Sequence, residues 1–206
     1  MGKLNSFSSQ FSMTDEQAMW RVQTQDDAAA FARLVQRWEG PITRLCARMT
    51  GDVHRGEDLK QETFARVFAR RKDFQPGAKF STWLWRIALN RCYDELRKRE
   101  RHGECSIEGA QDCATAIREE ASEEPSPDQR LAVQEECELV RCALLRLPEG
   151  PRAALVLRYC EGLKLREVAR ILEIPETTAS SRIAAGLAQI SRILEPQLDQ
   201  ARGCAR

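Results

Sequence analysis

The chain has 206 residues, of which 42% are apolar and 31% charged, a balance typical of a soluble folded protein and not of a disordered one. No apolar run approaches the roughly 20 residues that a membrane crossing needs. Residues 1–14 lack the basic start and apolar core of a signal peptide. We therefore expect a cytoplasmic protein without membrane insertion, in which residues 1–14 form a disordered extension.

Eight cysteines are scattered along the chain, and none forms a C-x-x-C pair. His102 and Cys105 have ligand spacing, but no second pair of ligands accompanies them. Thiols in a cytosolic protein are usually reduced. We expect small buried or solvated thiols, and neither a metal nor any other cofactor.

Charge is distributed unevenly, although the net charge is only +1. Counting Lys and Arg against Asp and Glu gives +7 for residues 66–102 and −6 for residues 103–127. The basic block suits either phosphate binding or a solvated helix face. The acidic block, which is poor in large apolar residues, predicts a flexible linker. The chain then divides into a module at 15–102, the linker at 103–127, a module at 128–200 and a tail at 201–206.

Four helices are predicted in the first module. Thr14 or Asp15 caps the first helix, and Asp26 or Asp27 caps the second. Gly40-Pro41 is expected to break or kink the second helix, because proline lacks the amide hydrogen that the helix needs.

The third and fourth helices each begin after a short segment that interrupts the preceding helix. Gly51-Asp52 ends one helix and starts the next, whose stripe of apolar residues includes Leu59, Phe64 and Val67. Gln75-Pro76-Gly77 forces a loop. Ser81 then caps a long helix that runs through roughly Arg101.

The second module is also helical, and neither module has the alternation of a strand. The predicted helices cover residues 128–146, 150–161, 165–172 and 176–194, with a break at residues 173–175. The fold class is therefore all-α, with two small helical modules joined by the acidic linker.

The last two helices have the pattern of a helix-turn-helix. Ile174 fills the turn, and Pro175 prevents the first helix from continuing. The buried positions are expected to be Val168, Ala169, Leu172, Ile183, Leu187 and Ile190. In such motifs the start of the second helix reads the major groove. An ordinary helical hairpin is the alternative, and the few cations on the second helix predict weak autonomous DNA binding.

Aromatic and basic residues alternate where the fourth helix begins. Phe80, Trp83 and Trp85 lie within six residues, and arginines follow them. This pattern suits single-stranded nucleic acid, whose bases stack on rings while phosphates meet cations. A core corner with a solvated basic helix is the alternative. We expect Trp83 to pack inward and Trp85 to be partly exposed.

Taken together, these segments resemble the bacterial RNA polymerase sigma factors of the extracytoplasmic-function type, the sigma-70 group that contains only domains 2 and 4. The first module matches at residues 57–64 (EDLKQETF) and 80–88 (FSTWLWRIA), with Asn90, Asp94 and Arg97. The second matches at Leu147-Pro148, Arg152, residues 157–159, 161–163 and 167–169, Thr178 and Ser181-Arg182. The motifs come in the family's order over residues 15–195.

The resemblance implies three functional surfaces. The third helix would bind the clamp helices of the polymerase β′ subunit through Asp58, Gln61, Glu62 and Phe64. A −10 promoter element would be melted and held by Phe74, Lys79, Phe80, Ser81, Trp83, Arg86, Asn90 and Arg97. A −35 element would be read by Arg166, Thr177, Thr178, Ser180, Ser181 and Arg182.

The partners implied by the resemblance are core RNA polymerase, through its β′ clamp helices and β flap, promoter DNA, and an anti-sigma factor that holds the protein until a signal arrives. The free protein would be a monomer. Ala179 and Ser180 stand where the family usually has Val and Lys, and Ala184 and Ala185 where it has a basic pair, which weakens the expected −35 reading.

Two other classes of protein are less consistent with the sequence. A repressor or activator would dimerise on a palindrome, and it has no use for the motifs at residues 57–64 and 80–90. An enzyme is disfavoured because the chain has only His54 and His102, no Gly-rich phosphate loop and no pairing of a nucleophile with a base.

Overall fold

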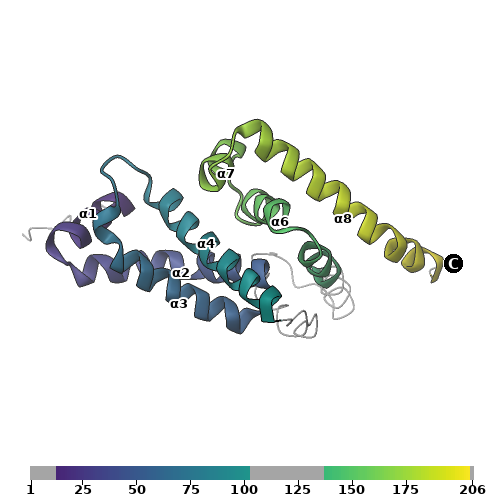
Figure 1. Cartoon of the computed structure of the whole chain (residues 1–206), viewed down its shortest axis with the longest axis horizontal. Coiled ribbons are helices and arrows are strands. Elements are labelled where there is room, and N and C mark those ends of the chain that lie inside the picture. Colours follow the sequence, from purple (N-terminus) through teal and green to yellow (C-terminus); the bar gives the residue numbers. More distant parts are fainter. Residues whose placement is uncertain (1–12, 103–136, 205–206) are drawn as a thin grey trace, which may run out of the picture.

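Figure 1 shows the computed structural model, which describes residues 13–102 and 137–204. Every regular element in these two ranges is helical. The first range contains α1 (Asp15–Gln25), α2 (Ala28–Thr50), α3 (Val53–Ala69), the 3-10 turn η1 (Arg71–Asp73) and α4 (Phe80–His102). The second contains a helix over residues 137–145, α6 (Glu149–Leu155), the π-helical turn η4 (Val156–Cys160), α7 (Leu165–Leu172) and α8 (Glu176–Cys204). The predictions for residues 1–12, 103–127 and 128–136 fall outside the described residues.

The predicted caps start the first two helices. The Thr14 side chain accepts a hydrogen bond from the Gln17 amide, and the Gln17 side chain accepts one from the Thr14 amide. Asp27 caps α2 by accepting from the amides of Ala29 and Ala30, both at 3.0 Å. Gly51 ends α2 in the left-handed region with φ 79°, which supports the predicted stop there.

A break or a kink was the prediction at Gly40-Pro41; helix α2 continues through Pro41, so the helix is not broken there. Proline removes one backbone hydrogen bond, but buried residues fix the helix on both sides of it. Leu34 before the proline and Ile42, Leu45 and Met49 after it are at most 1% exposed. Packing therefore outweighs the local cost of the proline.

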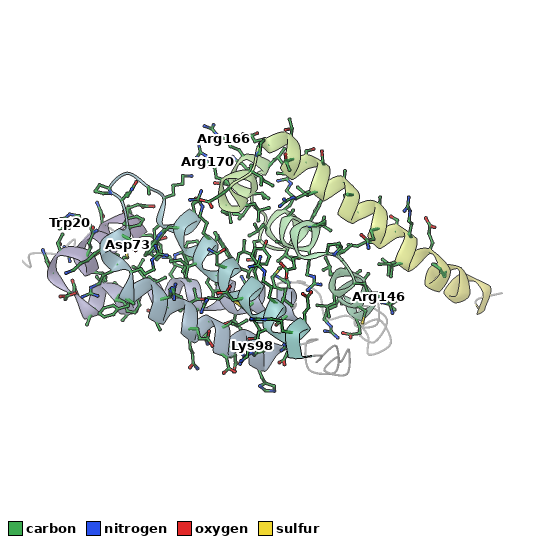
Figure 2. All side chains as sticks on the ribbon, in the orientation of Figure 1. Trp20, Asp73, Lys98, Arg146, Arg166 and Arg170 are labelled. Carbon is green, nitrogen blue, oxygen red and sulfur yellow. The ribbon has the colours of Figure 1, made fainter. Side chains whose placement is uncertain are left out.

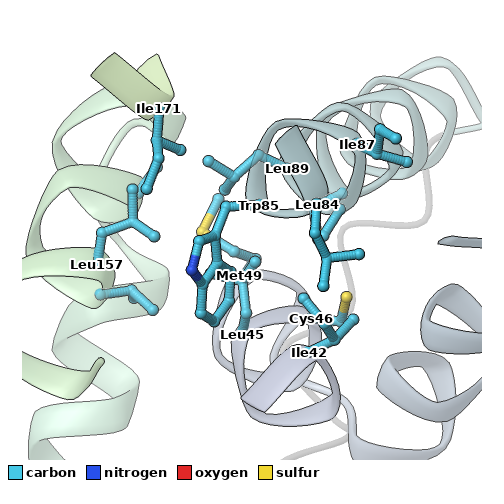
Figure 3. Close-up of a cluster of buried hydrophobic side chains, with 14 of the residues drawn as sticks. Ile42, Leu45, Cys46, Met49, Leu84, Trp85, Ile87, Leu89, Leu157 and Ile171 are labelled. Atoms are coloured by element: carbon cyan, nitrogen blue, oxygen red, sulfur yellow. The ribbon is translucent and has the colours of Figure 1, made fainter. Parts of the chain in front are cut away.

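One continuous core joins the two modules. Figure 3 shows Trp85 and Leu89 of α4, together with Met49 of α2, facing Leu157 and Ile171 of the C-terminal helices. All five side chains are buried. The C-terminal helices thus lie along α4 and the end of α2, and they cover a face that would be apolar in the first module alone.

The packing of the C-terminal helices on α4 reverses the prediction for the two tryptophans. Trp85 is 3% exposed, whereas Trp83 is half-buried. Trp85 packs edge-on against Trp38, with ring centroids 5.8 Å apart, and its other side meets the C-terminal module. The prediction that Trp85 is the exposed ring is wrong, because it considered the first module by itself.

Helix α8 is longer than predicted and presents a different residue inward. It runs to Cys204 and not to about residue 194. Leu187 was expected to be buried, but it is 41% exposed. The neighbouring Gly186 faces the core instead: a Cβ there would lie 2.7 Å from a methyl carbon of Leu155. Close approach of α8 to α6 therefore requires glycine and turns Leu187 outward.

Within residues 13–102 and 137–204, none of the helices has both the length and the apolar character that a membrane crossing requires.

Candidate nucleic-acid interface

Helix α3 presents a polar face on the outside of the first module. Asp58, Gln61 and Glu62, here called the α3 face, are all exposed. The side chain of Asp58 is 60% exposed and pairs with Arg55 at 3.3 Å, and Glu62 lies 3.9 Å from Arg91. Phe64, predicted to share this surface, is 6% exposed and packs edge-on against Phe31. It supports the α3 face from beneath and does not extend it.

The entrance to α4 is an aromatic cluster held from two sides. Phe80 is fully buried and Phe74 is 4% exposed, so these two predicted DNA contacts are core residues here. The Phe74 and Trp83 rings have centroids 5.4 Å apart, and Phe80 lies 6.3 Å from Trp83. Trp83 is the one member of this trio with an accessible part.

Two side chains from α1 fix the backbone around this cluster. The Gln23 amide nitrogen donates to the carbonyl oxygens of Lys72 and Phe74, both at 3.0 Å. The Phe80 amide donates to the Glu16 carboxylate at 3.2 Å. Helix α4 begins at Phe80, so Ser81 lies inside the helix and the prediction that it caps the helix is wrong. The loop before α4 is therefore anchored to the first module at both ends.

Beyond the cluster, α4 carries a basic surface. Five residues, here called the α4 surface, include two exposed cations and a partly accessible ring: Lys79, Trp83, Arg86, Asn90 and Arg97. Ser81 beside them is half-buried. The spacing of Trp83, Arg86, Asn90 and Arg97 keeps them near one side of the helix, where a ring and cations can meet bases and phosphates.

Helices α7 and α8 form the predicted helix-turn-helix. Val168 and Ala179 are fully buried where the two helices meet, and Ala169 is 3% exposed. Glu173 ends α7 in the left-handed region with φ 55°, and the Ile174 amide donates to the Ala169 carbonyl at 3.1 Å. The turn therefore has the boundaries that the sequence predicted.

The start of α8 presents small polar residues. Thr177, Ser180, Ser181 and Arg182, here called the α8 face, point away from that junction, although Arg182 is half-buried. The Ser181 hydroxyl donates to the Thr177 carbonyl at 2.9 Å. Thr178 is half-buried. Arg166 and Arg170 project from α7 at the edge of the molecule (Figure 2).

The α4 surface and the α8 face border one cleft of about 500 Å³. Trp83, Asn90 and Arg97 line one side of it, and Arg182 lines the other. Tyr93 lies between them, and burial, with a contribution from nearby Glu149, raises its pKa to about 12. The α4 surface and one residue of the α8 face, Arg182, thus adjoin the same space.

Sequence reasoning missed the polar contacts that bind the modules together. Arg48 pairs with Glu161 at 2.8 Å, across 113 residues of chain. Arg86 donates to the Arg170 carbonyl across 84 residues. No sequence signal predicts such pairs, because each partner belongs to a separate module and neither residue type is unusual on a helix surface.

Comparisons with known proteins match both modules. The family model of sigma-70 region 2 matches residues 34–102, and that of sigma-70 region 4 matches residues 137–190. The chain is 34% identical over 162 residues to the ECF RNA polymerase sigma factor SigW of Bacillus subtilis, a match covering 78% of this chain and 86% of that protein. The chain belongs to the extracytoplasmic-function sigma factors.

Other relatives agree with this assignment. This sigma factor is 32% identical to the RNA polymerase sigma-H factor of Pseudomonas aeruginosa over 188 residues, which cover 91% of this chain and 97% of that protein. The solved structure of CnrH in complex with the cytosolic domain of CnrY shares its fold, with a TM-score of 0.64 and 24% identity over 88% of this chain and 97% of that one. The region 2 match contains the α3 face and the α4 surface, and the region 4 match contains the helix-turn-helix.

Proposed function

We propose that this sigma factor binds core RNA polymerase through the α3 face and the C-terminal module, and directs it to promoters. The α4 surface melts and holds the −10 element, and the α8 face with Arg166 reads the −35 element. The observation that carries this proposal is the combination of an accessible ring and cations on α4 with a helix-turn-helix in the same chain. The protein acts in the cytoplasm as a binding factor and not as an enzyme.

The geometry supports different roles for the residues assigned to DNA. Phe74 and Phe80 shape the entrance of α4 from inside the core, while Trp83 offers the ring on which an unpaired base can stack. Opening a duplex costs a few kcal/mol of unstacking, which such stacking and phosphate contacts offset. Lys79, Arg86 and Arg97 supply the cations.

We also propose that an anti-sigma factor controls this protein. One solved structure of similar fold holds the sigma factor RpoE in complex with the anti-sigma factor NepR from Bartonella quintana, with a TM-score of 0.58 and 22% identity over 80% of this chain and 96% of that one. Copurification from the native host, followed by identification of any bound protein, tests this part of the proposal. A chain that copurifies with polymerase alone under all growth conditions would contradict it.

The polymerase assignment is tested with Asp58→Ala and Gln61→Ala combined. Both side chains are exposed, and Asp58 pairs with Arg55 three residues away on the same helix, so the fold should survive. We expect affinity for core polymerase to fall at least tenfold in a pull-down titration. The control is Gln36→Ala with Glu39→Ala, which removes an amide and a carboxylate at the same spacing from the exposed side of α2. Equal binding by both double variants would contradict the α3 assignment.

The −35 assignment is tested with Arg182→Ala. Losing one arginine that contacts a base costs about 1–3 kcal/mol of binding, or about 10- to 150-fold in affinity. Promoter duplex binding by the assembled holoenzyme should therefore weaken, while core binding stays unchanged. Arg146→Ala, which removes an exposed arginine before α6, is the matched control. If core polymerase with the wild-type chain initiates from no promoter in a genomic library, the proposed function itself is wrong.

A further inference from the structure

Trp20 of α1 is the one tryptophan whose surface is mainly exposed. It is 52% exposed, whereas Trp85 is buried and the other two tryptophans are half-buried. Phe68, the other exposed ring of the first module, is covered by the Arg71 guanidinium, 4.4 Å from its centroid. Among the described residues, nothing comparable stacks on Trp20 or accepts a hydrogen bond from its indole nitrogen. Tryptophan is enriched at binding interfaces, so an uncovered indole points to a ligand.

Trp20 lies beside the loop that leads into α4. Glu16 and Gln23, which flank it on α1, bind backbone groups of residues 72, 74 and 80 at 3.0 to 3.2 Å. At 3.6 residues per turn, positions 16, 20 and 23 fall within about 60° around the helix, and position 20 is the farthest of them from the buried side. The ring therefore lies at the outer edge of the contact between α1 and the loop. Figure 2 shows it at the same end of the molecule as Asp73.

The surroundings of this ring are polar and basic. Its neighbours on the outer side of α1 are exposed, and they include Arg21 and Thr24. Lys72 and Lys79, at the two ends of the loop, are exposed as well, and no carboxylate pairs with Lys72 among the described residues. The core of a protein–protein interface is depleted of charged residues, whereas Trp20 has Arg21 and Lys72 as near neighbours. A single ring among cations suits a nucleic-acid base and its phosphates instead.

In the proposed promoter complex, the unpaired strand leaves α4 in the direction of α1. Trp83 lies in the first turn of α4, and the cations Arg86 and Arg97 follow toward the other end of the helix. Duplex DNA binds through its phosphates, whereas stacking on a ring needs an unpaired base. The duplex therefore lies along the later turns of α4, and the unpaired strand begins at Trp83. Beyond Trp83 this strand passes the loop, and Figure 1 shows α1 at that end of the first module.

We propose that Trp20 is a second stacking site for the unpaired promoter strand and holds a base beyond those held at Trp83. This inference rests on the proposed function of the α4 surface, which it extends across the loop onto α1. Trp20 takes no part in binding a closed duplex, because stacking on its ring requires an unpaired base. It contributes to open promoter complexes alone, whose lifetime the stacked base prolongs.

Two fork-shaped probes separate Trp20 from the rest of the DNA surface. Both carry the −10 element of a promoter from which the wild-type holoenzyme initiates, with duplex upstream of the element. The unpaired strand ends with the element in the short probe and continues for about ten nucleotides in the long one. Replacing a stacking ring by alanine costs about 5- to 150-fold in affinity. We expect the Trp20→Ala holoenzyme to lose that factor on the long probe and nothing on the short one. Trp20→Phe, which keeps a ring, should recover most of the loss.

The matched control is Tyr159→Ala, which removes a ring that is 61% exposed in the C-terminal module. Comparing each variant on the two probes cancels any change in core binding, and Tyr159→Ala should keep the wild-type ratio between the probes. Equal affinity of the Trp20→Ala and wild-type holoenzymes for the long probe would overturn the inference. An equal loss on both probes would also overturn it, because Trp20 would then act through the fold or through polymerase.

A second measurement distinguishes this inference from the proposed function. If the wild-type holoenzyme initiates from no promoter, the proposed function fails, and the full free chain then tests Trp20 by itself. Oligothymidylate of about 20 nucleotides should quench the tryptophan fluorescence of the free chain. Trp20→Phe should lose at least half of that quenching, since the other three indoles are buried or half-buried. Quenching that Trp20→Phe retains in full would overturn stacking at Trp20, whatever the promoter result.

Discussion

The start of α4 and the helix-turn-helix both present polar residues to nucleic acid, but they are built by different kinds of contact. In the helix-turn-helix, Val168, Ala169 and Ala179 pack against one another within twelve residues of chain. At the start of α4, Phe80 and Trp85 are positioned by residues of α1, α2 and the C-terminal module. The first unit is a local structure, whereas the second depends on the assembly of the whole chain.

The largest effect is expected at Trp85. Its ring is 3% exposed and lies between the modules, so Trp85→Ala should lower the free energy of unfolding by about 3–5 kcal/mol. Trp83→Ala, which removes the half-buried ring two residues away, should cost less than half of that. Urea unfolding followed by circular dichroism measures both. Equal losses would mean that the assembled core does not distinguish the two rings.

A loss almost as large is expected at Arg152, which is 8% exposed. Its guanidinium donates to the carbonyl oxygens of Met49 and Leu145, both at 2.6 Å, and of Leu147 at 2.8 Å. Burial lowers its pKa from the ordinary value for arginine, and it has no carboxylate partner among the described residues. It therefore joins the end of α2 to the C-terminal module through hydrogen bonds to carbonyls alone.

Arg152→Ala leaves three carbonyl groups without that donor, so the free energy of unfolding should fall by about 2–4 kcal/mol in the same urea experiment. Arg146→Ala, at an exposed position nearby, should change it by less than about 0.5 kcal/mol. If the two variants unfold alike, Arg152 does not couple the modules as the structure indicates.

The same contrast explains what the sequence could predict. The helix-turn-helix was located correctly at residues 165–172 and from residue 176 because caps, a turn residue and apolar spacing act within a few residues. Gly51 was also a reliable stop, since only glycine adopts its φ of 79° without strain.

The predictions that failed depended on distant partners. Pro41 was judged by its local cost, although buried residues on both sides hold α2 together. Trp85 was judged as part of an isolated module, and Leu187 was assigned inward although Gly186 must take that place against Leu155. The assignment of Phe80 to the −10 element, which came from the family resemblance, stays a prediction, and in this structure three other aromatic rings lie around Phe80. Spacing identifies an apolar residue and does not tell which surface covers it.

The smallest effect is expected for a contact inside the first module. Glu95 of α4 accepts hydrogen bonds from Arg55 of α3, at 2.8 and 2.6 Å, and lies 3.3 Å from Arg99. The hydrogen bonds from Arg55, with the charges of both arginines, hold the pKa of Glu95 below its ordinary value of 4.5. These ion pairs connect α3 and α4 of the first module and do not involve the second module.

Glu95→Gln should lower the free energy of unfolding by about 1–2 kcal/mol at pH 7. Because the pKa of Glu95 is lower in the folded protein than in the unfolded chain, its ionised form stabilises the fold above about pH 4.5, and this contribution is lost as the pH falls through the lowered pKa. The difference between wild type and Glu95→Gln should therefore shrink as urea titrations move from pH 7 toward about pH 3.

Glu100→Gln, at an exposed position on the same helix, should show no comparable difference. Since these ion pairs are internal to the first module, the radius of gyration of Glu95→Gln should match that of the wild type. An expanded Glu95→Gln chain would instead place this carboxylate among the groups that hold the two modules together.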